Sequence, residues 1–223
     1  MRQEMVPSVP QSEPQLRKAL ESTASYYEGH AAEYFQRTVH ADLSNIYDRF
    51  LTFVPTAGRI LDAGCGSGRD LREFGQRGYR ATGIDASREL VELAKRYSSA
   101  PCHVMRLEAL SYVGCFEAIW ACASLLHLPK AMLDGVLRRL AKALVPHGVM
   151  FASVQIGEGE SLGHDGRFFA YYSKNEFIEA ITAAGFESLD VWISEDALPG
   201  RRTVCWLNVI ARATHGTTRE LPS

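Results

Sequence analysis

The sequence lacks paired cysteines, long apolar segments and an excess of charge of either sign. Its five cysteines are scattered, with no CxxC pair and no histidine at metal-ligand spacing, which argues against structural zinc and for buried free thiols. No stretch approaches the roughly 20 apolar residues of a membrane-spanning helix. The sequence therefore predicts no metal site, no membrane association and a cytoplasmic location.

The charge balance disfavours a nucleic-acid partner without excluding one. Lys and Arg total 24 against 26 for Asp and Glu, so the chain has no overall positive field with which to hold a polyanion. Hydrophobic residues make up 46% of the 223 residues, which is ordinary usage for a globular protein. We expect one hydrophobic core, a small-molecule partner, and a monomer or homodimer.

From residue 59 onward, short apolar runs alternate with helical patterns, which is typical of βα units in a doubly wound α/β fold. Strands are predicted over 59–63, 79–84, 102–107, 116–122, 148–155, 186–194 and 202–211. Helices are predicted over 69–77, 87–96, 130–144 and 173–184. The predicted organisation is a flexible tail over 1–14, an N-terminal helical cap over 15–55, the main domain over 56–213, and a second tail over 214–223.

The strongest local pattern is a glycine-rich loop after the first predicted strand. Residues 59–70 read RILDAGCGSGRD, so an apolar strand ends near Asp62 and runs into Gly64, Gly66 and Gly68. Glycine permits positive φ and removes the Cβ atoms that would keep a ligand from the backbone. At the carboxyl end of a strand this pattern predicts a ligand crevice. The spacing is GxGxG rather than GxGxxG, which makes a dinucleotide the weaker interpretation.

Asp85 ends the second predicted strand, about twenty residues after the glycine loop, where an acidic side chain can bind ribose hydroxyls. Two alternatives remain open. The loop can be a tight strand-to-helix turn without a ligand, and Asp85 can cap the helix that begins near Ser87.

The segments DAGCGSGRD and TGIDAS resemble motifs of the class I S-adenosylmethionine-dependent methyltransferases, and the resemblance extends over about 24–211. It implies a Rossmann-like seven-stranded sheet whose last strand is antiparallel, S-adenosylmethionine as cofactor, and direct in-line methyl transfer. GRDL and GYRATGID also resemble tellurite-resistance and thiopurine-type methyltransferases.

By this resemblance Asp62 and Gly64 lie near the methionine part of the cofactor, Asp85 at the ribose and Ala86 at the adenine. The predicted cofactor-binding residues are Asp62, Gly64, Cys65, Gly66, Gly68, Asp85, Ala86, Glu108, Ala121, Cys122, Tyr26 and Tyr34. Glu108 stands where Asp is commoner in the family. His127 is the candidate catalytic base, although a structural role is the competing interpretation.

The acceptor site is expected at the N-terminal tyrosines and over 157–172, where glycines alternate with rings in a pattern that suits a lid. The predicted substrate-binding residues are Tyr27, Arg167, Phe168, Tyr171 and Tyr172. A surface crossover whose rings pack on the sheet is equally compatible with this stretch. The sequence leaves open whether the acceptor is a neutral hydroxyl or a protonated amine, which needs a base, or a thiolate or another soft anion, which needs none. A tRNA or protein methyltransferase and a non-catalytic cofactor-binding module remain alternatives.

Overall fold

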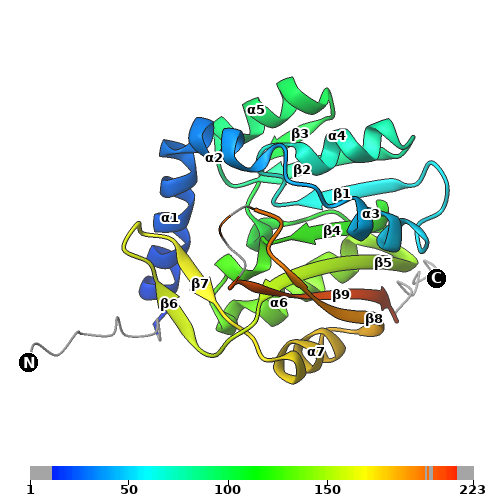
Figure 1. Cartoon of the computed structure of the whole chain (residues 1–223). Helices are drawn as coiled ribbons and strands as arrows, with labels where there is room; N and C mark the ends of the chain where they lie inside the picture. Colours follow the sequence, from blue (N-terminus) through cyan, green and yellow to red (C-terminus); the bar gives the residue numbers. More distant parts are fainter. Residues whose placement is uncertain (1–11, 199, 201–202, 215–223) are drawn as a thin grey trace, which may run out of the picture.

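Seven strands form one sheet in the order β3-β2-β1-β4-β5-β9-β8 (Figure 1). The computed structural model describes residues 12–198, 200 and 203–214. The strands of the sheet are β1 (Arg59–Ala63), β2 (Arg80–Asp85), β3 (Cys102–Val104), β4 (Phe116–Cys122), β5 (Leu144–Gln155), β8 (Phe186–Glu195) and β9 (Cys205–Ala213). Neighbouring strands pair in parallel except β9, which is antiparallel to both β5 and β8. The predicted Rossmann-like sheet with an antiparallel last strand is confirmed.

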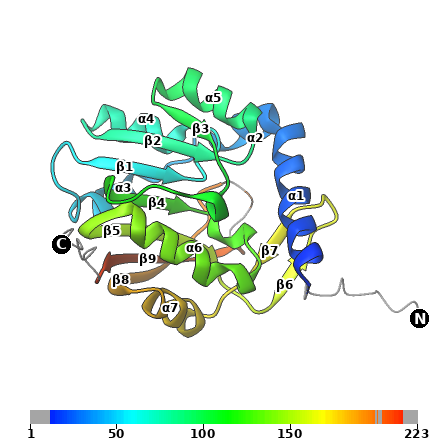
Figure 2. The same cartoon turned by 180° about the vertical axis from the view of Figure 1, so that it is seen from behind.

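Helices cover both faces of the sheet. They are α1 (Glu13–Gly29), α2 (Ala31–Thr38), α3 (Ser44–Leu51), α4 (Arg69–Gln76), α5 (Arg88–Ser98), α6 (Lys130–Ala143) and α7 (Lys174–Ala183), with short 3-10 helices η1 (Leu107–Ala109) and η2 (Leu125–His127). Helices α3, α4 and α5 bury apolar side chains against one face. Helices α6 and α7 cover the other face and lie in front in Figure 2. Each face thus has its own apolar layer, as the near-continuous apolar runs of β4 and β5 require.

Element boundaries depart from the sequence prediction where pairing is non-local. Strand β3 ends at Val104 rather than at residue 107, because the chain turns into η1 directly afterwards. Strand β5 begins at Leu144, four residues early, because Leu144 already pairs with Phe116 across an irregularity in the ladder. The pairing of Leu144 with Phe116 joins residues far apart in the chain, so it leaves no local pattern in the sequence.

The predicted N-terminal cap divides between two places. Helix α1 lies along the carboxyl edge of the parallel strands, at the left of Figure 1, and α2 follows it. Helix α3 instead buries Tyr47 and Phe50 against the face of the sheet. The helix α1 begins within the predicted tail, because Pro14 occupies its first turn, where a proline is tolerated. Most of the two predicted tails lies outside the described residues.

The stretch over 157–172 is not an open loop. It forms an antiparallel hairpin of β6 (Glu160–Leu162) and β7 (Phe168–Ala170) beside α1 (Figures 1 and 2). The Thr23 hydroxyl accepts a hydrogen bond from the Phe168 N–H at 2.9 Å, and the Ser22 hydroxyl donates to the Gly166 carbonyl at 2.7 Å. Gly166 adopts φ +85°, so it serves the turn of the hairpin.

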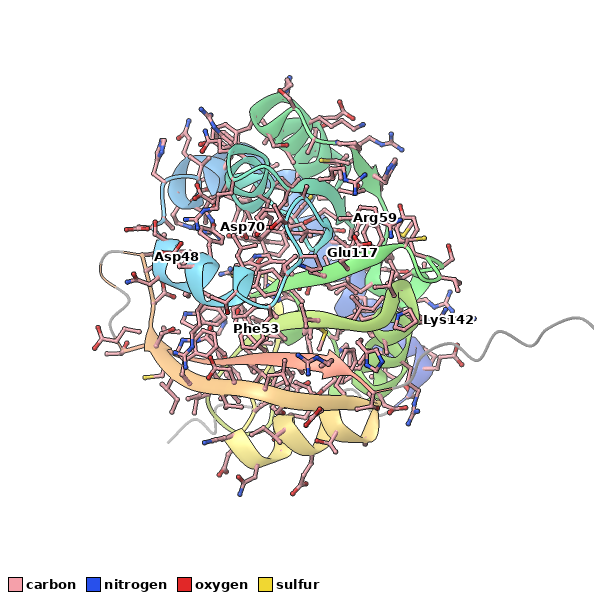
Figure 3. The ribbon with its side chains drawn as sticks, turned by 90° about the vertical axis from the view of Figure 1, so that its right-hand side faces the viewer. Asp48, Phe53, Arg59, Asp70, Glu117 and Lys142 are labelled. Atoms are coloured by element: carbon pink, nitrogen blue, oxygen red, sulfur yellow. The ribbon has the colours of Figure 1, made fainter. Side chains whose placement is uncertain are left out.

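Figure 3 looks onto the opposite edge of the sheet, where the parallel strands begin. There Arg59 of β1 and Glu117 of β4 lie side by side, and the guanidinium donates to the carboxylate at 2.7 Å. This pair fastens two central strands at the edge away from the glycine loop. Among the described residues, no helix is both long and apolar enough to cross a membrane.

Candidate active site

The glycine loop connects β1 to α4 at the carboxyl edge of the sheet. Gly64, Gly66 and Gly68 all have positive φ values, of +96°, +47° and +78°. A Cβ atom on Gly64 would lie 2.5 Å from the Ser124 Cβ, and one on Gly66 would lie 3.1 Å from the Tyr34 ring. A side chain at either position would close the space above the loop. The glycines therefore keep the backbone open to a ligand, as the sequence predicted.

A cavity lies above this loop and brings together most of the predicted cofactor residues. Its predicted members are Gly64, Gly66, Asp85, Ala86, Glu108, Cys122 and Tyr34, together with Tyr27 and His127. Helix α1 covers it with Leu20, Thr23 and Ala24, and Ser124 completes the side toward η2. None of these four positions carried a recognisable sequence pattern.

The Asp85 carboxylate holds the glycine loop and faces the cavity at the same time. One oxygen accepts from the Gly66 N–H at 3.0 Å, and the other accepts from the Ser87 N–H at 2.9 Å. Burial raises the pKa of Asp85, while these backbone N–H groups act to lower it. Each carboxylate oxygen keeps a second lone pair, so Asp85 can still accept a hydrogen bond from a bound hydroxyl.

Five predicted cofactor residues do not line the cavity. Cys65 packs under the loop, 2.9 Å from where a Cβ on Gly83 would lie, and Gly68 permits close contact with Ala94. Ala121 is buried in β4, and the Tyr26 ring stacks on His30 at 4.4 Å. Asp62, the fifth, is buried in β1. None of these five lines the cavity, so the structure does not show the direct contact that was expected of them. Asp62 and Ala121 lie in strands, Cys65 and Gly68 in the loop, and Tyr26 in α1.

Two buried polar atoms near the loop have no hydrogen-bond partner: Asp62 Oδ2 and Ser124 Oγ. Burial raises the pKa of Asp62, and the neighbouring Asp70 raises it further. Ser124 lines the cavity. A buried unpaired polar atom costs free energy unless water or a ligand satisfies it, so Ser124 fits a cavity built to receive a polar ligand.

The side chains of Tyr27 and His127 both line this cavity and contact each other. The Tyr27 hydroxyl lies 2.8 Å from His127 Nε2, and His127 Nδ1 lies 2.7 Å from the Phe168 carbonyl oxygen. Burial lowers the pKa of His127 to about 4, and the Arg167 charge acts in the same direction. His127 is therefore a neutral imidazole at pH 7, and its role as a catalytic base stays a prediction.

A second cavity adjoins the first. Five residues line both: Tyr27, Tyr34, Cys122, Ala123 and His127. The second cavity also receives three guanidinium groups, from Arg37, Arg69 and Arg167, and the polar side chains of Ser153, Gln155 and Asn208. The same five residues therefore border both cavities.

The predicted acceptor residues separate by strand alternation in the hairpin. Arg167 and Phe169 line the second cavity, and the guanidinium lies 5.1 Å from the Phe169 ring centre. Phe168 and Tyr172 are each only 1% exposed and pack in the main core, so the expectation that they face an acceptor is corrected. Tyr171 stacks on Phe169 outside both cavities. Phe169 was counted among the rings of this stretch but not among the predicted substrate-binding residues, although it is the phenylalanine that lines the second cavity.

A buried polar network under the second cavity also escaped the sequence analysis. The Asp70 carboxylate accepts hydrogen bonds from the Tyr47 hydroxyl, from Trp120 Nε1 at 2.8 Å and from Arg69 Nε at 2.6 Å. These partners hold the pKa of Asp70 below its usual range against the opposing effect of burial. The network fixes Arg69 at the cavity wall. Its partners come from α3, β4 and α4, and only the fold brings them together.

Comparison with known proteins agrees with this arrangement. A family model described as a methyltransferase domain matches residues 60–148. The crystal structure of Burkholderia thailandensis 1,6-didemethyltoxoflavin-N1-methyltransferase, with bound 1,6-didemethyltoxoflavin and S-adenosylhomocysteine, has a TM-score of 0.76 at 22% identity and covers 94% of each chain. Residues 60–148 are thus similar to a methyltransferase domain, and the chain has the fold of this S-adenosylhomocysteine-bound methyltransferase. S-adenosylmethionine is the cofactor of this domain family.

Two curated relatives of the methyltransferase domain have similar sequences. YqeM of Bacillus subtilis strain 168, provisionally named a methyltransferase, is 28% identical over 139 residues, which are 57% of this chain and 55% of that protein. The ubiquinone biosynthesis O-methyltransferase of Methylocella silvestris is 31% identical over 157 residues, 59% of each chain. The chain thus matches little more than half of either relative. The likeness to tellurite-resistance and thiopurine-type enzymes is not shown and stays a hypothesis.

Proposed function

We propose that this chain transfers a methyl group from S-adenosylmethionine, bound in the first cavity, to a small molecule bound in the second. The observation that carries the proposal is the shared wall of Tyr27, Tyr34, Cys122, Ala123 and His127. Methyl transfer needs the two reactants in contact and in line. Two adjoining cavities bordered by the same five residues would place the two reactants next to each other.

The residues of the first cavity suit the parts of the cofactor. Asp85 keeps lone pairs for the ribose hydroxyls, and Ala86 and Glu108 lie on the side proposed for the adenine. The open backbone at Gly64, with the unpaired Ser124 hydroxyl, suits the polar methionine part. When bound, the cofactor supplies a methyl group already activated by its sulfonium, so the protein has to bind, orient and exclude water.

A small acceptor is favoured because α1 and the β6-β7 hairpin cover this edge of the sheet. Thr23 and Ser22 of α1 form hydrogen bonds with the hairpin, and Tyr27 of α1 forms a hydrogen bond with His127 of η2. A site covered by a helix and a hairpin in this way admits a small molecule more readily than a folded macromolecule. The net charge of −2 gives no general attraction for RNA.

Titration calorimetry with S-adenosylmethionine, S-adenosylhomocysteine and NAD tests the first half of the proposal. We expect micromolar-range affinity for the first two and none for NAD. Binding of NAD alone would contradict the cofactor assignment.

Incubation with cofactor carrying a labelled methyl group tests the second half. Label should enter small-molecule fractions of a cell extract. Label found only in tRNA or only in protein would favour the macromolecular alternative, and cofactor binding without transfer to any fraction would favour a non-catalytic module.

A further inference from the structure

The hydroxyl of Tyr27 has a fixed direction at the junction of the two cavities. Building on the proposed function, we propose that the methyl acceptor presents a hydrogen-bond donor, a hydroxyl or a ring N–H, to the Tyr27 oxygen. Tyr27 is then a residue that sets acceptor specificity, and His127 is a positioning residue that acts through it.

The direction follows from the partner of His127. The Phe168 carbonyl, 2.7 Å from His127 Nδ1, can only accept a hydrogen bond, so Nδ1 carries a proton. Burial lowers the pKa of the ring to about 4, so at pH 7 the ring has no second proton. Nε2 is therefore an acceptor, and the Tyr27 hydroxyl, 2.8 Å away, is the donor. Both nitrogens of His127 are occupied within the protein.

Tyr27 consequently has no proton left for a ligand. Burial raises its pKa, so the hydroxyl stays protonated and its one proton points to His127. The neighbouring Arg167 is itself a donor toward the same oxygen. What remains for the cavities is a lone pair, which favours a ligand N–H or O–H and disfavours a carboxylate, thiolate or phenolate.

Three elements hold this arrangement in place. Tyr27 comes from α1, His127 from η2, and the carbonyl from β7, which the Thr23 hydroxyl ties back to α1. The Tyr27 ring also packs edge-on against the Tyr34 ring, with centres 5.2 Å apart. Reversing the hydroxyl would leave His127 Nε2 without its partner inside the protein.

The choice between acceptor classes therefore comes from Tyr27. The sequence left open a neutral hydroxyl or a protonated amine on one side and a soft anion on the other. Because Tyr27 lines both cavities, the lone pair that its oxygen keeps favours a hydrogen-bond donor over an anion. The three guanidinium groups of the second cavity do not reverse this preference for a donor. Arg69, Arg167 and Arg37 are already paired with Asp70, Asp165 and Glu33, and Glu195 and Asp196 line the same cavity.

The first experiment measures the tautomer of His127 in the full chain by long-range ¹⁵N–¹H NMR at pH 7.5, with the His127→Asn variant identifying the resonances. We expect a protonated Nδ1 and an unprotonated Nε2 whose shift changes in Tyr27→Phe. A protonated Nε2 would overturn the inference. This measurement does not depend on cofactor binding, whereas the proposed function fails only if S-adenosylmethionine does not bind or react.

The second experiment measures binding of phenol, anisole and thiophenolate by saturation-transfer NMR, with S-adenosylhomocysteine present. Phenol should bind about tenfold more tightly than its methyl ether or the thiolate, as one directed hydrogen bond implies. The preference should fall to within about twofold in Tyr27→Phe. The variant His127→Asn should also lose the preference for phenol. Its amide keeps a donor for the Phe168 carbonyl, but the proton of the Tyr27 hydroxyl is no longer held by an imidazole nitrogen.

Tyr26→Phe is the matched control, because Tyr26 lies next to Tyr27 but outside both cavities. It should keep the preference of the parent protein. Equal binding of phenol and anisole to the parent, or no measurable binding of phenol, would overturn the inference. Persistence of the preference in Tyr27→Phe would do the same.

Discussion

At the scale of single residues, the ionisable groups of the site are held in defined states by burial and by their neighbours. His127 is neutral because desolvation outweighs its hydrogen bond to the Phe168 carbonyl. Burial raises the pKa of Asp85, and hydrogen bonds from backbone N–H groups oppose this effect. Each state has a consequence that can be measured.

The pH dependence of stability should report on His127. Its pKa is about 4 in the folded protein against an ordinary value of 6.5, so between these values the unfolded chain binds a proton that the folded chain does not. The free energy of unfolding should therefore fall as pH drops from 7.5 to 5, by about 2 kcal/mol from this group.

Urea unfolding of the parent and of His127→Asn at both pH values measures this effect. The variant should be less stable at pH 7.5 but should lose about 2 kcal/mol less between the two pH values. Parallel losses in both proteins would mean that His127 titrates normally in the fold.

The variant Asp85→Asn should weaken cofactor binding more than it weakens folding. Losing a charged acceptor for the ribose hydroxyls should raise the dissociation constant of S-adenosylhomocysteine about 10- to 100-fold. Glu28→Gln is a suitable control, since Glu28 binds the nearby Ser87 hydroxyl at 2.6 Å but lines neither cavity. If calorimetry shows equal effects of the two variants, Asp85 serves the loop alone.

At the scale of elements, the β6-β7 hairpin shows how one strand divides its side chains between core and site. Phe168 and Ala170 are buried, while Arg167 and Phe169 reach the second cavity. The pattern of glycines and rings predicted an acceptor-binding lid here, but it assigned Phe168 and Tyr172, which are buried in the core, to the acceptor side. The composition of a segment does not predict the register of its strands. A shift of one residue in register moves every side chain of a strand to the opposite face.

The two neighbouring phenylalanines should therefore respond differently to truncation. Phe168→Ala removes a fully buried ring and should cost about 3–5 kcal/mol of unfolding free energy. Phe169→Ala removes a half-buried ring and should cost markedly less, while altering the acceptor cavity. Chemical denaturation of both variants tests the assignment, and a larger loss for Phe169→Ala would restore the original interpretation.

At the scale of the whole molecule, the site is assembled from segments far apart in the chain. The first cavity joins α1, the glycine loop, the end of β2 and η2. A ligand bound there contacts both the sheet and its helical roof. Its binding should therefore stabilise the fold as a unit.

S-adenosylhomocysteine at about 100 times its dissociation constant should add about 2.7 kcal/mol to the free energy of unfolding. Calorimetric scanning should show a higher melting temperature with this ligand and no change with NAD. An unchanged melting temperature at saturating ligand would contradict binding to the folded state alone.

The parts of this protein that depend on local rules could be predicted from its amino-acid sequence. Alternating apolar and helical segments predicted the sheet and most helices, because period and turn chemistry are written in adjacent residues. The glycine loop and Asp85 predicted a ligand crevice at this edge of the sheet, because a strand, a turn and an acid at fixed spacing meet there, and the first cavity lies at the same place. The strand β4 was predicted to the residue, since it is buried on both faces.

The proposed acceptor side could not be predicted in this way, because it is formed by contacts between distant parts of the chain. The Asp70 network, the hairpin register and the contact between Tyr27 and His127, 100 residues apart, depend on how separate elements pack. No local pattern specifies which lone pair or proton points into a shared space. That direction is set by the Phe168 carbonyl, a backbone atom whose position comes from the fold and not from the identity of its side chain.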